Sequence, residues 1–348
     1  MRAGSYAPAF HAVLGRGASV ERCAATMAVV FAWAALSGCE GSSQAAPGPS
    51  TRSSAAASRP PPDADGGRST GPVCVRDEAF PSPWLVPEAS AAAEVELRPG
   101  VREILVVGDS GRHGAAMAWS REGGFRPMTL ALDAAACDDL EGMAWLEESS
   151  GAHLYTLTSS GAVRRFAPDG KGALRRDEDA YAIGAPPLTC ADLRDGNCGK
   201  NWEGLCLRAS GIQARCAGYA ASKTETALYC LVFGPGGHLS VDSGVEPIKL
   251  PVDRILRSQG ALSDCAFGAR GGPAERLLLV TTNVFGGSAT YLVNEAAASG
   301  DRLTPIQVLS TPSNEAIAVD RNGWLYAFMD DNGETSIATR FRCQGWPK

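Results

Sequence analysis

The feature that most constrains the fold of this chain is an internal repeat that runs through residues 100–341. In each copy an acid-containing step precedes a short apolar strand, and a loop then leads to a second apolar strand. The four clear copies begin with DLEGMAW at 139–145, NWEGLCL at 201–207, LSDCAFG at 262–268 and SNEAIAV at 313–319. A repeat of about 40–60 residues built from short strands is typical of β-propeller blades, which stack around an axis because one blade cannot bury both of its faces.

Strand signals dominate the same region, whereas helical periodicity fits only 88–94 and 313–319. A fifth unit at 105–119 matches the strands but lacks the acidic step. We therefore expect an all-β propeller of five or six blades over residues 73–348. A two-sheet sandwich is the alternative, but it gives no reason for such a regular recurrence. The apolar runs bounded by Gly, Pro, Asp or Ser are EILVVG at 103–108, HLYTLTS at 153–159, ALYCLVF at 227–233, RLLLVTT at 276–282 and WLYAFMD at 324–330.

One acidic residue is aligned in each clear copy of the repeat. In a propeller the innermost strand of every blade runs along the central channel, so acids at the strand starts converge on one mouth. Close carboxylates repel, which raises their pKa values or recruits a cation, and oxygen ligands suit Ca²⁺. We expect a calcium site there, or alternatively carboxylates that accept backbone N–H bonds from the next blade. The aligned acids are Glu141, Glu203, Asp264 and Glu315, and further candidate oxygen donors are Asn201, Asn314, Asp109, Asp330 and Asp331.

The EG step, the LY pair that follows it and the Asp-rich turn of SNEAIAVDRNGWLYAFMDDNG resemble the SdiA-regulated and esterase-like phytase group of β-propellers. The resemblance covers most of residues 100–341. It implies calcium at this kind of position, and for an enzyme it implies metal-dependent hydrolysis of phosphoesters or carboxyesters. The third copy has no Gly after Asp264, and the fourth has Ala316 in place of the Gly.

A phosphate-binding site needs several cationic side chains. The basic residues near the repeat acids are few and scattered over different blades. We therefore expect a propeller that binds a ligand or a protein partner, with the hydrolase as the alternative. These basic residues are Lys200, Lys223, Arg112 and Arg165.

A second motif, ILVVGDSGRHG at 104–114, resembles the first block of the GDS-type hydrolases and would make Ser110 a nucleophile. That chemistry needs a His base oriented by a carboxylate. The GDS-type enzymes carry an Asp-x-x-His near the C-terminus, but the last His of this chain is His238. His113 lies only three residues from Ser110, which is poor triad geometry. The motif therefore does not predict a serine hydrolase.

Residues 24–36 form an uncharged apolar run that is too short to span a bilayer and is typical of a signal peptide. The run ends in Leu36-Ser37-Gly38-Cys39, which resembles the lipobox of bacterial lipoproteins. The resemblance implies cleavage before Cys39 and acylation of Cys39 with chains such as palmitate. An ordinary signal peptide with a chance Cys is the alternative.

This reading divides the chain into a signal peptide over 1–38, a disordered linker over 39–72 that starts at the lipidated Cys, and the propeller over 73–348. We expect an extracytoplasmic protein anchored by lipid to a bacterial membrane, at the outer membrane or the periplasmic face. The formal net charge of −6 without a basic cluster argues against nucleic acid as a partner. We expect a monomer whose ligand or protein partner the sequence does not name.

The chain has eleven Cys, of which Cys23 belongs to the signal peptide and Cys39 to the lipobox. The nine that remain are an odd number, so we expect at least one free thiol. No C-x-x-C occurs, which disfavours zinc, and an exported protein favours disulfides. Some of these Cys could instead be small buried hydrophobes. The candidate pairs are Cys190 with Cys198 across a polar loop, Cys206 with Cys230 in one sheet, and Cys74 with Cys343 at the two ends of the body.

Overall fold

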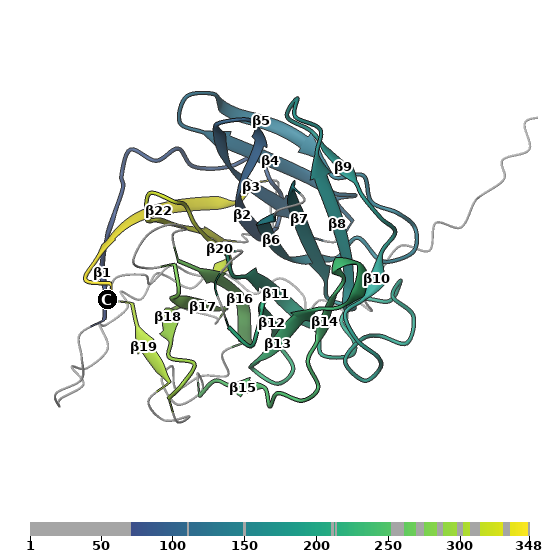
Figure 1. The fold of residues 1–348 in the computed structure, drawn as a ribbon. Helices are drawn as coiled ribbons and strands as arrows, with labels where there is room; N and C mark the ends of the chain where they lie inside the picture. Colours follow the sequence, from purple (N-terminus) through teal and green to yellow (C-terminus); the bar gives the residue numbers. More distant parts are fainter. Residues whose placement is uncertain are drawn as a thin grey trace, which may run out of the picture. The chain divides into compact units, whose positions relative to one another are not determined.

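The computed structural model describes residues 71–346, apart from 110, 149–150, 210–211, 213, 252–260, 269–274, 284–287, 298–301, 307–313 and 330–334. Within these residues the chain forms antiparallel strands in five sheets, together with one short 3₁₀ helix, η1 (Pro235–Gly237) (Figure 1). This part of the chain has no helix that is long and apolar enough to cross a membrane.

Each sheet is one blade, and its strands follow one another in the sequence from the centre outwards. The first blade contains β2 (Ala89–Arg98), β3 (Val101–Gly108), β4 (Ala115–Ser120) and β5 (Gly124–Thr129). The second contains β6 (Leu140–Glu148), β7 (Gly151–Thr158), β8 (Ala162–Pro168), β9 (Leu174–Arg176) and β10 (Tyr181–Ala182). The third contains β11 (Trp202–Leu207), β12 (Gly218–Ser222), β13 (Ala227–Phe233), β14 (Leu239–Val241) and β15 (Ile248–Lys249).

The fourth and fifth blades complete the set. The fourth contains β16 (Ala261–Phe267), β17 (Leu278–Asn283), β18 (Thr290–Val293) and β19 (Leu303–Pro305). The fifth contains β20 (Asn314–Val319), β21 (Trp324–Met329), β22 (Ile337–Gln344) and, from the other end of the described chain, β1 (Val73–Arg76).

The first strands of the five repeats form a closed ring. Strands β2, β6, β11, β16 and β20 contact one another in this order, and β20 returns to contact β2. The fold is therefore a β-propeller, as the repeat predicted, and it has five blades. Every residue of β11 is buried, because both faces of an inner strand pack against neighbouring blades. The segment 88–94, which also fits a helical period, belongs to β2 from Ala89 onwards.

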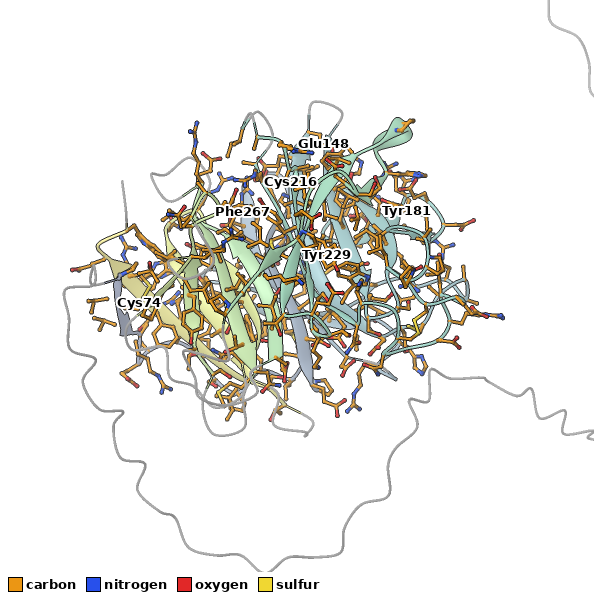
Figure 2. The ribbon with its side chains drawn as sticks, turned by 90° about the horizontal axis from the view of Figure 1, so that it is seen from below. Cys74, Glu148, Tyr181, Cys216, Tyr229 and Phe267 are labelled. Atoms are coloured by element: carbon orange, nitrogen blue, oxygen red, sulfur yellow. A yellow bond between two sulfur atoms is a disulfide. The ribbon has the colours of Figure 1, made fainter. Side chains whose placement is uncertain are left out.

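Strand β1 closes the ring by pairing with β22, with Cys74 opposite Cys343. The predicted disulfide between these two residues is present, and it links positions 269 residues apart (Cys74 is labelled in Figure 2). The predicted Cys190–Cys198 disulfide is present as well. Cys137 is the buried free thiol that the odd count required.

The third predicted pair, Cys206 with Cys230, is wrong. Both side chains belong to the third blade, but Tyr219 on β12 lies between them in the strand register. They are two strand spacings apart, about 10 Å, which is beyond the reach of a disulfide. Cys206 instead bonds Cys265 of the fourth blade, and Cys230 bonds Cys216.

The Gly of the EG step is explained by how closely the inner strands approach one another. A Cβ at Gly142 would lie 2.5 Å from the backbone nitrogen of Leu205, and a Cβ at Gly204 would lie 2.8 Å from an Asp264 oxygen. Both distances are shorter than any ordinary carbon contact. Gly at these two positions therefore lets neighbouring blades meet at the axis.

Candidate functional site

Each innermost strand carries a β-bulge close to its start. The register shifts fall between Ala89 and Ala91, Leu140 and Gly142, Trp202 and Gly204, Leu262 and Asp264, and Asn314 and Ala316. A bulge re-aims a side chain and is common beside functional sites. The five bulged residues are Ser90, Glu141, Glu203, Ser263 and Glu315.

These five residues lie at the same end of the channel. Ser90 Oγ donates a hydrogen bond to the carbonyl of Leu140, and Ser263 Oγ donates to the carbonyl of Asn314 at 2.7 Å. Both bonds join a bulge to the start of the next inner strand, so the strands run side by side in one direction. We call this end of the channel, where the five innermost strands begin, the acidic mouth. The end where they finish is the opposite mouth.

Three of the four predicted acids occupy bulge positions at the acidic mouth, and Asp264 does not. In the fourth blade the bulge is Ser263, so the sequence alignment was one residue out of register there. Asp264 is buried, and its carboxylate accepts the N–H of Cys265 at 2.7 Å and that of Ile317 in the fifth blade at 2.8 Å. Burial raises the pKa of Asp264 well above its ordinary value. Asp264 thus adopts the alternative role considered from the sequence, a bond to the backbone of the next blade.

Glu203 has a cationic partner. Lys223, in the loop between β12 and β13, places Nζ 2.9 Å from Glu203 Oε1. Burial and the nearby Glu315 carboxylate raise the pKa of Glu203 to about 8, although Lys223 opposes the shift. Glu315 accepts a hydrogen bond from the side-chain amide of Asn283. The glutamates of the third and fifth blades therefore each have a partner inside the mouth.

Glu141 belongs to a tight group of carboxylates. Asp109, Asp139 and Glu141 each offer an oxygen, and these oxygens all lie within 4.8 Å of one another. Asp109 follows β3 of the first blade, whereas Asp139 and Glu141 flank the start of β6 in the second. Burial, reinforced by Glu203 and by both Asp neighbours, raises the pKa of Glu141 well above its ordinary value. We call these three residues the carboxylate trio.

The loops hold the trio in place. Asp138 accepts the N–H groups of Gly111 and His113, which fixes the loop that carries Asp109. Asp139 accepts the hydroxyl of Ser159, whose oxygen in turn accepts the N–H of Asn197 at 3.1 Å. Asn197 lies inside the loop closed by the Cys190–Cys198 disulfide. Covalent and hydrogen-bonded constraints therefore converge on one carboxylate.

The donor set of the trio suits a hard divalent cation. Two oxygens bound to one Ca²⁺ at about 2.3–2.6 Å can be at most about 5 Å apart, and the trio satisfies this limit. The side-chain oxygen of Asn201, directly before β11, is buried and has no hydrogen-bond donor in the described part of the chain. An amide oxygen of this kind is also a ligand type that Ca²⁺ accepts.

The backbone around the acidic mouth is strained. The described residues other than Gly that have positive φ are Glu88 (48°), His113 (51°), Asn197 (53°), Asn201 (46°) and Thr226 (49°). Glu88 and Asn201 each precede an innermost strand, and the other three lie in loops that return to the same end of the channel. Such conformations cost about 1–3 kcal/mol each and cluster at functional sites. Their gathering at one mouth makes it the candidate functional face.

The remaining predicted residues have structural partners or fall outside the description. The backbone of Asn314 bonds Ser288 and Ser263. The basic residues considered for phosphate binding form ion pairs, Arg112 with Glu88, Arg165 with Asp177 and Lys200 with Glu225. Ser110, Asp330 and Asp331 lie outside the described residues.

The channel itself is narrow, and the opposite mouth is built from ion pairs. A cavity of about 70 Å³ lies between inner-strand residues such as Ala92, Ala144 and Ala318, which leaves room for a few water molecules. At the opposite mouth Arg102 lies 2.6 Å from Glu96 and 2.7 Å from Glu147. A ligand larger than a few water molecules would therefore sit at a mouth and not in this cavity.

No protein-family model and no curated protein matches the chain. Among solved structures it is similar to a PQQ-bound aldose sugar dehydrogenase from Streptomyces coelicolor, with 14% identity, a TM-score of 0.40, and coverage of 78% of this chain and 98% of that one. It is also similar to the soluble aldose sugar dehydrogenase of Escherichia coli (13%, 0.38, 77% and 99%) and to virginiamycin B lyase from Staphylococcus aureus (9%, 0.38, 73% and 80%). These similarities concern the propeller fold alone.

Proposed function

We propose that this protein is a lipid-anchored, extracytoplasmic propeller that binds a ligand or protein partner at its acidic mouth, with calcium held by the carboxylate trio. The observation that carries the proposal is the approach of three carboxylate oxygens from two blades to within 4.8 Å of one another. Glu203 and Glu315, predicted from the sequence as calcium ligands, line the mouth beside the trio and have their own partners. Asp264 contributes to the contact between blades.

Calcium would serve this site in two ways. It would offset the burial and the neighbouring negative charges that disfavour the ionised form of Glu141 and raise its pKa. It would also join the loop after β3 to the start of β6, because the trio comes from both. The result would be a rigid rim on which the strained loops present their side chains to a partner.

The test is thermal unfolding with calcium and with a chelator, together with an assay of a generic phosphate ester. We expect calcium to raise the melting temperature without any turnover, because binding to the folded state alone stabilises it. Magnesium at the same concentration serves as the control, since it prefers a smaller octahedral shell that retains water. A melting temperature that does not respond to calcium would contradict the proposal.

A metal-dependent phosphoester or carboxyester hydrolase is the second candidate. The pKa of about 8 for Glu203 favours it, because a carboxyl group that titrates near neutrality suits general acid–base catalysis. Against it, Arg112, Arg165 and Lys200 are engaged by carboxylates and leave little to hold a phosphate. Turnover that disappears in a Glu203→Gln variant would favour this candidate over pure binding.

The anchor is proposed to be the acylated Cys39, which follows the apolar segment 24–36. Several acyl chains hold a protein at a membrane stably, whereas one chain does not. We expect labelled palmitate to be incorporated into the wild-type chain and the protein to sediment with membranes. A Cys39→Ser variant should lose both properties. A variant that keeps the label would contradict acylation at this residue.

A further inference from the structure

Cys137, the free thiol of the described chain, is packed against the loop that the Cys190–Cys198 disulfide closes. It lies in the connection between β5 and β6 and is 4% exposed. Its backbone N–H donates to the carbonyl of Leu193 at 3.0 Å, and Leu193 lies between the two bonded cysteines. The free thiol is therefore buried next to a disulfide and not in a separate part of the core.

Ser160, in the turn between β7 and β8, contacts both the thiol and the disulfide loop. Its Oγ lies 3.8 Å from Cys137 Sγ and donates to the carbonyl of Leu193 at 3.0 Å. Its backbone carbonyl accepts the N–H of Cys190 at 2.9 Å. Cys137 and Cys190 are thus neighbours on either side of one residue, and Cys190 carries the bond to Cys198.

The two bonded sulfurs differ in their access to solvent. Cys190 is 3% exposed, whereas Cys198 is half-buried. Thiol–disulfide exchange releases one sulfur as a thiolate, and an apolar interior disfavours a thiolate. Cys198 is therefore the better leaving group, and Cys190 is the sulfur that an internal thiol would attack. Burial raises the pKa of the Cys137 thiol, so the attacking thiolate is rare and the exchange is slow.

We propose that Cys137 exchanges with the Cys190–Cys198 disulfide and thereby moves the free thiol from the interior to the surface. The sulfur of Cys137 bonds Cys190 Sγ, the bond between Cys190 and Cys198 breaks, and the proton that leaves Cys137 ends on Cys198. The number of disulfides is unchanged, so the step needs neither an oxidant nor a reductant. Cys198 then becomes a modification site for electrophiles and for disulfide-bearing molecules.

The exchange also acts on the carboxylate trio, because Asn197 is next to Cys198 in the chain. The N–H of Asn197 donates to Ser159 Oγ at 3.1 Å, and the Ser159 hydroxyl donates to Asp139. Opening the disulfide ring releases this support. This consequence rests on the proposed calcium site, whereas the exchange itself does not.

The experiment treats the folded full-length chain with iodoacetamide at mildly alkaline pH and locates the label by peptide mapping without reduction. We expect the label on Cys198, with Cys137 and Cys190 recovered as one disulfide-linked pair of peptides. A Cys137→Ser variant should leave Cys198 unlabelled. The Cys216–Cys230 disulfide is the internal control and should stay intact.

Three labelling results would overturn the exchange. They are a label on Cys137 in the folded chain, no label on any of these three cysteines, and a label on Cys198 that persists in Cys137→Ser. If Cys137→Ser does not fold, Cys198→Ser gives a second test. Diamide, a thiol oxidant, should join Cys137 to Cys190 in that variant, and failure to do so would also overturn the exchange.

Cys190→Ser is the matched control for the second test. Here diamide should leave Cys137 and Cys198 unlinked, and a bond between them would overturn the assignment of Cys190 as the attacked sulfur. The chain labelled at Cys198 should bind calcium about 10-fold more weakly than the unlabelled chain. If the unlabelled chain binds no calcium, the proposed calcium site is wrong, and the position of the label still decides whether the exchange occurs.

Discussion

Both mouths of the channel carry acidic side chains, but the described partners of these side chains differ. At the opposite mouth Arg102 lies between Glu96 and Glu147, Arg321 lies 3.7 Å from Glu147, and Arg208 binds Glu295 at 2.5 Å. At the acidic mouth Lys223 lies 2.9 Å from Glu203 and also acts electrostatically on Glu141 and Glu315. An acid at the end of a propeller strand is therefore not in itself a sign of a ligand site. The cations around such an acid determine whether it is available to bind a ligand.

The two mouths also differ in their backbone conformations. The described residues with strained positive φ and a side chain all lie in loops of the acidic mouth. The opposite mouth has Glu148 and Phe267 at strand ends, together with the loop that carries Cys216 and joins β11 to β12 (Figure 2). Strain persists only where the surrounding structure over-determines it. The loops of the acidic mouth are thus held in backbone conformations that cost free energy. At the opposite mouth, arginines form ion pairs with the carboxylates.

The largest effect should come from neutralising the trio. Asp109→Asn combined with Glu141→Gln removes two of three anionic donors, and we expect calcium affinity to fall about 100-fold or more. Calorimetry measures this loss, and the calcium-induced rise in melting temperature should disappear with it. Glu96→Gln combined with Glu147→Gln, the same kind of change at the opposite mouth, should leave the affinity unchanged. If both double variants lost the same calcium affinity, the two mouths would not differ in metal binding, and the proposed site would be wrong.

The pH dependence of stability should come next in size. The pKa of Glu203 is raised to about 8 in the folded chain, from 4.5 as the ordinary value. Between these two values the folded state holds more protons at Glu203 than the unfolded state, so the contribution of Glu203 to stability is highest below about pH 4.5 and falls as the pH rises toward 8. Melting temperatures measured with a chelator from pH 5 to 8 should show this decline.

A Glu203→Gln variant carries no titrating proton at this position, so its decline over the same range should be shallower. Glu96→Gln, in the opposite mouth, is the matched substitution for comparison. Should Glu203→Gln follow the wild-type curve throughout, the titration would belong to another group, and the electrostatic account of the acidic mouth would need revision.

A smaller effect should follow from opening the Cys190–Cys198 loop. This loop supports Asp139 through Asn197 and Ser159. Cys190→Ser combined with Cys198→Ser leaves every calcium donor in place but releases their support, and we expect a loss of affinity of about 10-fold. Cys216→Ser combined with Cys230→Ser removes a disulfide of the third blade outside the acidic mouth and should spare the affinity. A larger loss of calcium affinity in the variant without the Cys216–Cys230 disulfide would show that the Cys190–Cys198 loop does not support the trio.

Much of this architecture could be predicted from the sequence, because a repeated unit has to place equivalent residues at equivalent points. The recurring acid before a short apolar strand identified the innermost strands and placed Glu141, Glu203 and Glu315 at one mouth. The alignment failed at Asp264 because Ser263 and Asp264 are adjacent and only the strand register shows which of them bulges. Asp264 instead fills the space that Gly204 leaves open.

Features that depend on neighbouring blades were not visible in the sequence. Asp139 was missed as a site residue, although it stands two positions before Glu141, because its role depends on Ser159 and on Asp109 of another blade. The Cys206–Cys265 bond was missed for the same reason. Periodicity reports what one blade contains, but not which atoms of the next blade it meets.

The smallest effect should come from removing the ion pairs that Arg102 forms at the opposite mouth. Arg102→Met leaves Glu96 and Glu147 without the arginine between them, and because these groups are partly exposed we expect a loss of only about 1 kcal/mol in the free energy of unfolding, measured with denaturant. Arg215→Met, at a side chain that is 66% exposed, should cost less. Calcium should not stabilise Arg102→Met, since the glutamates there lack the convergence of the trio. If calcium does stabilise it, removing one neighbouring cation would be enough to create a metal site, and the geometry of the acidic mouth would matter less than its charge.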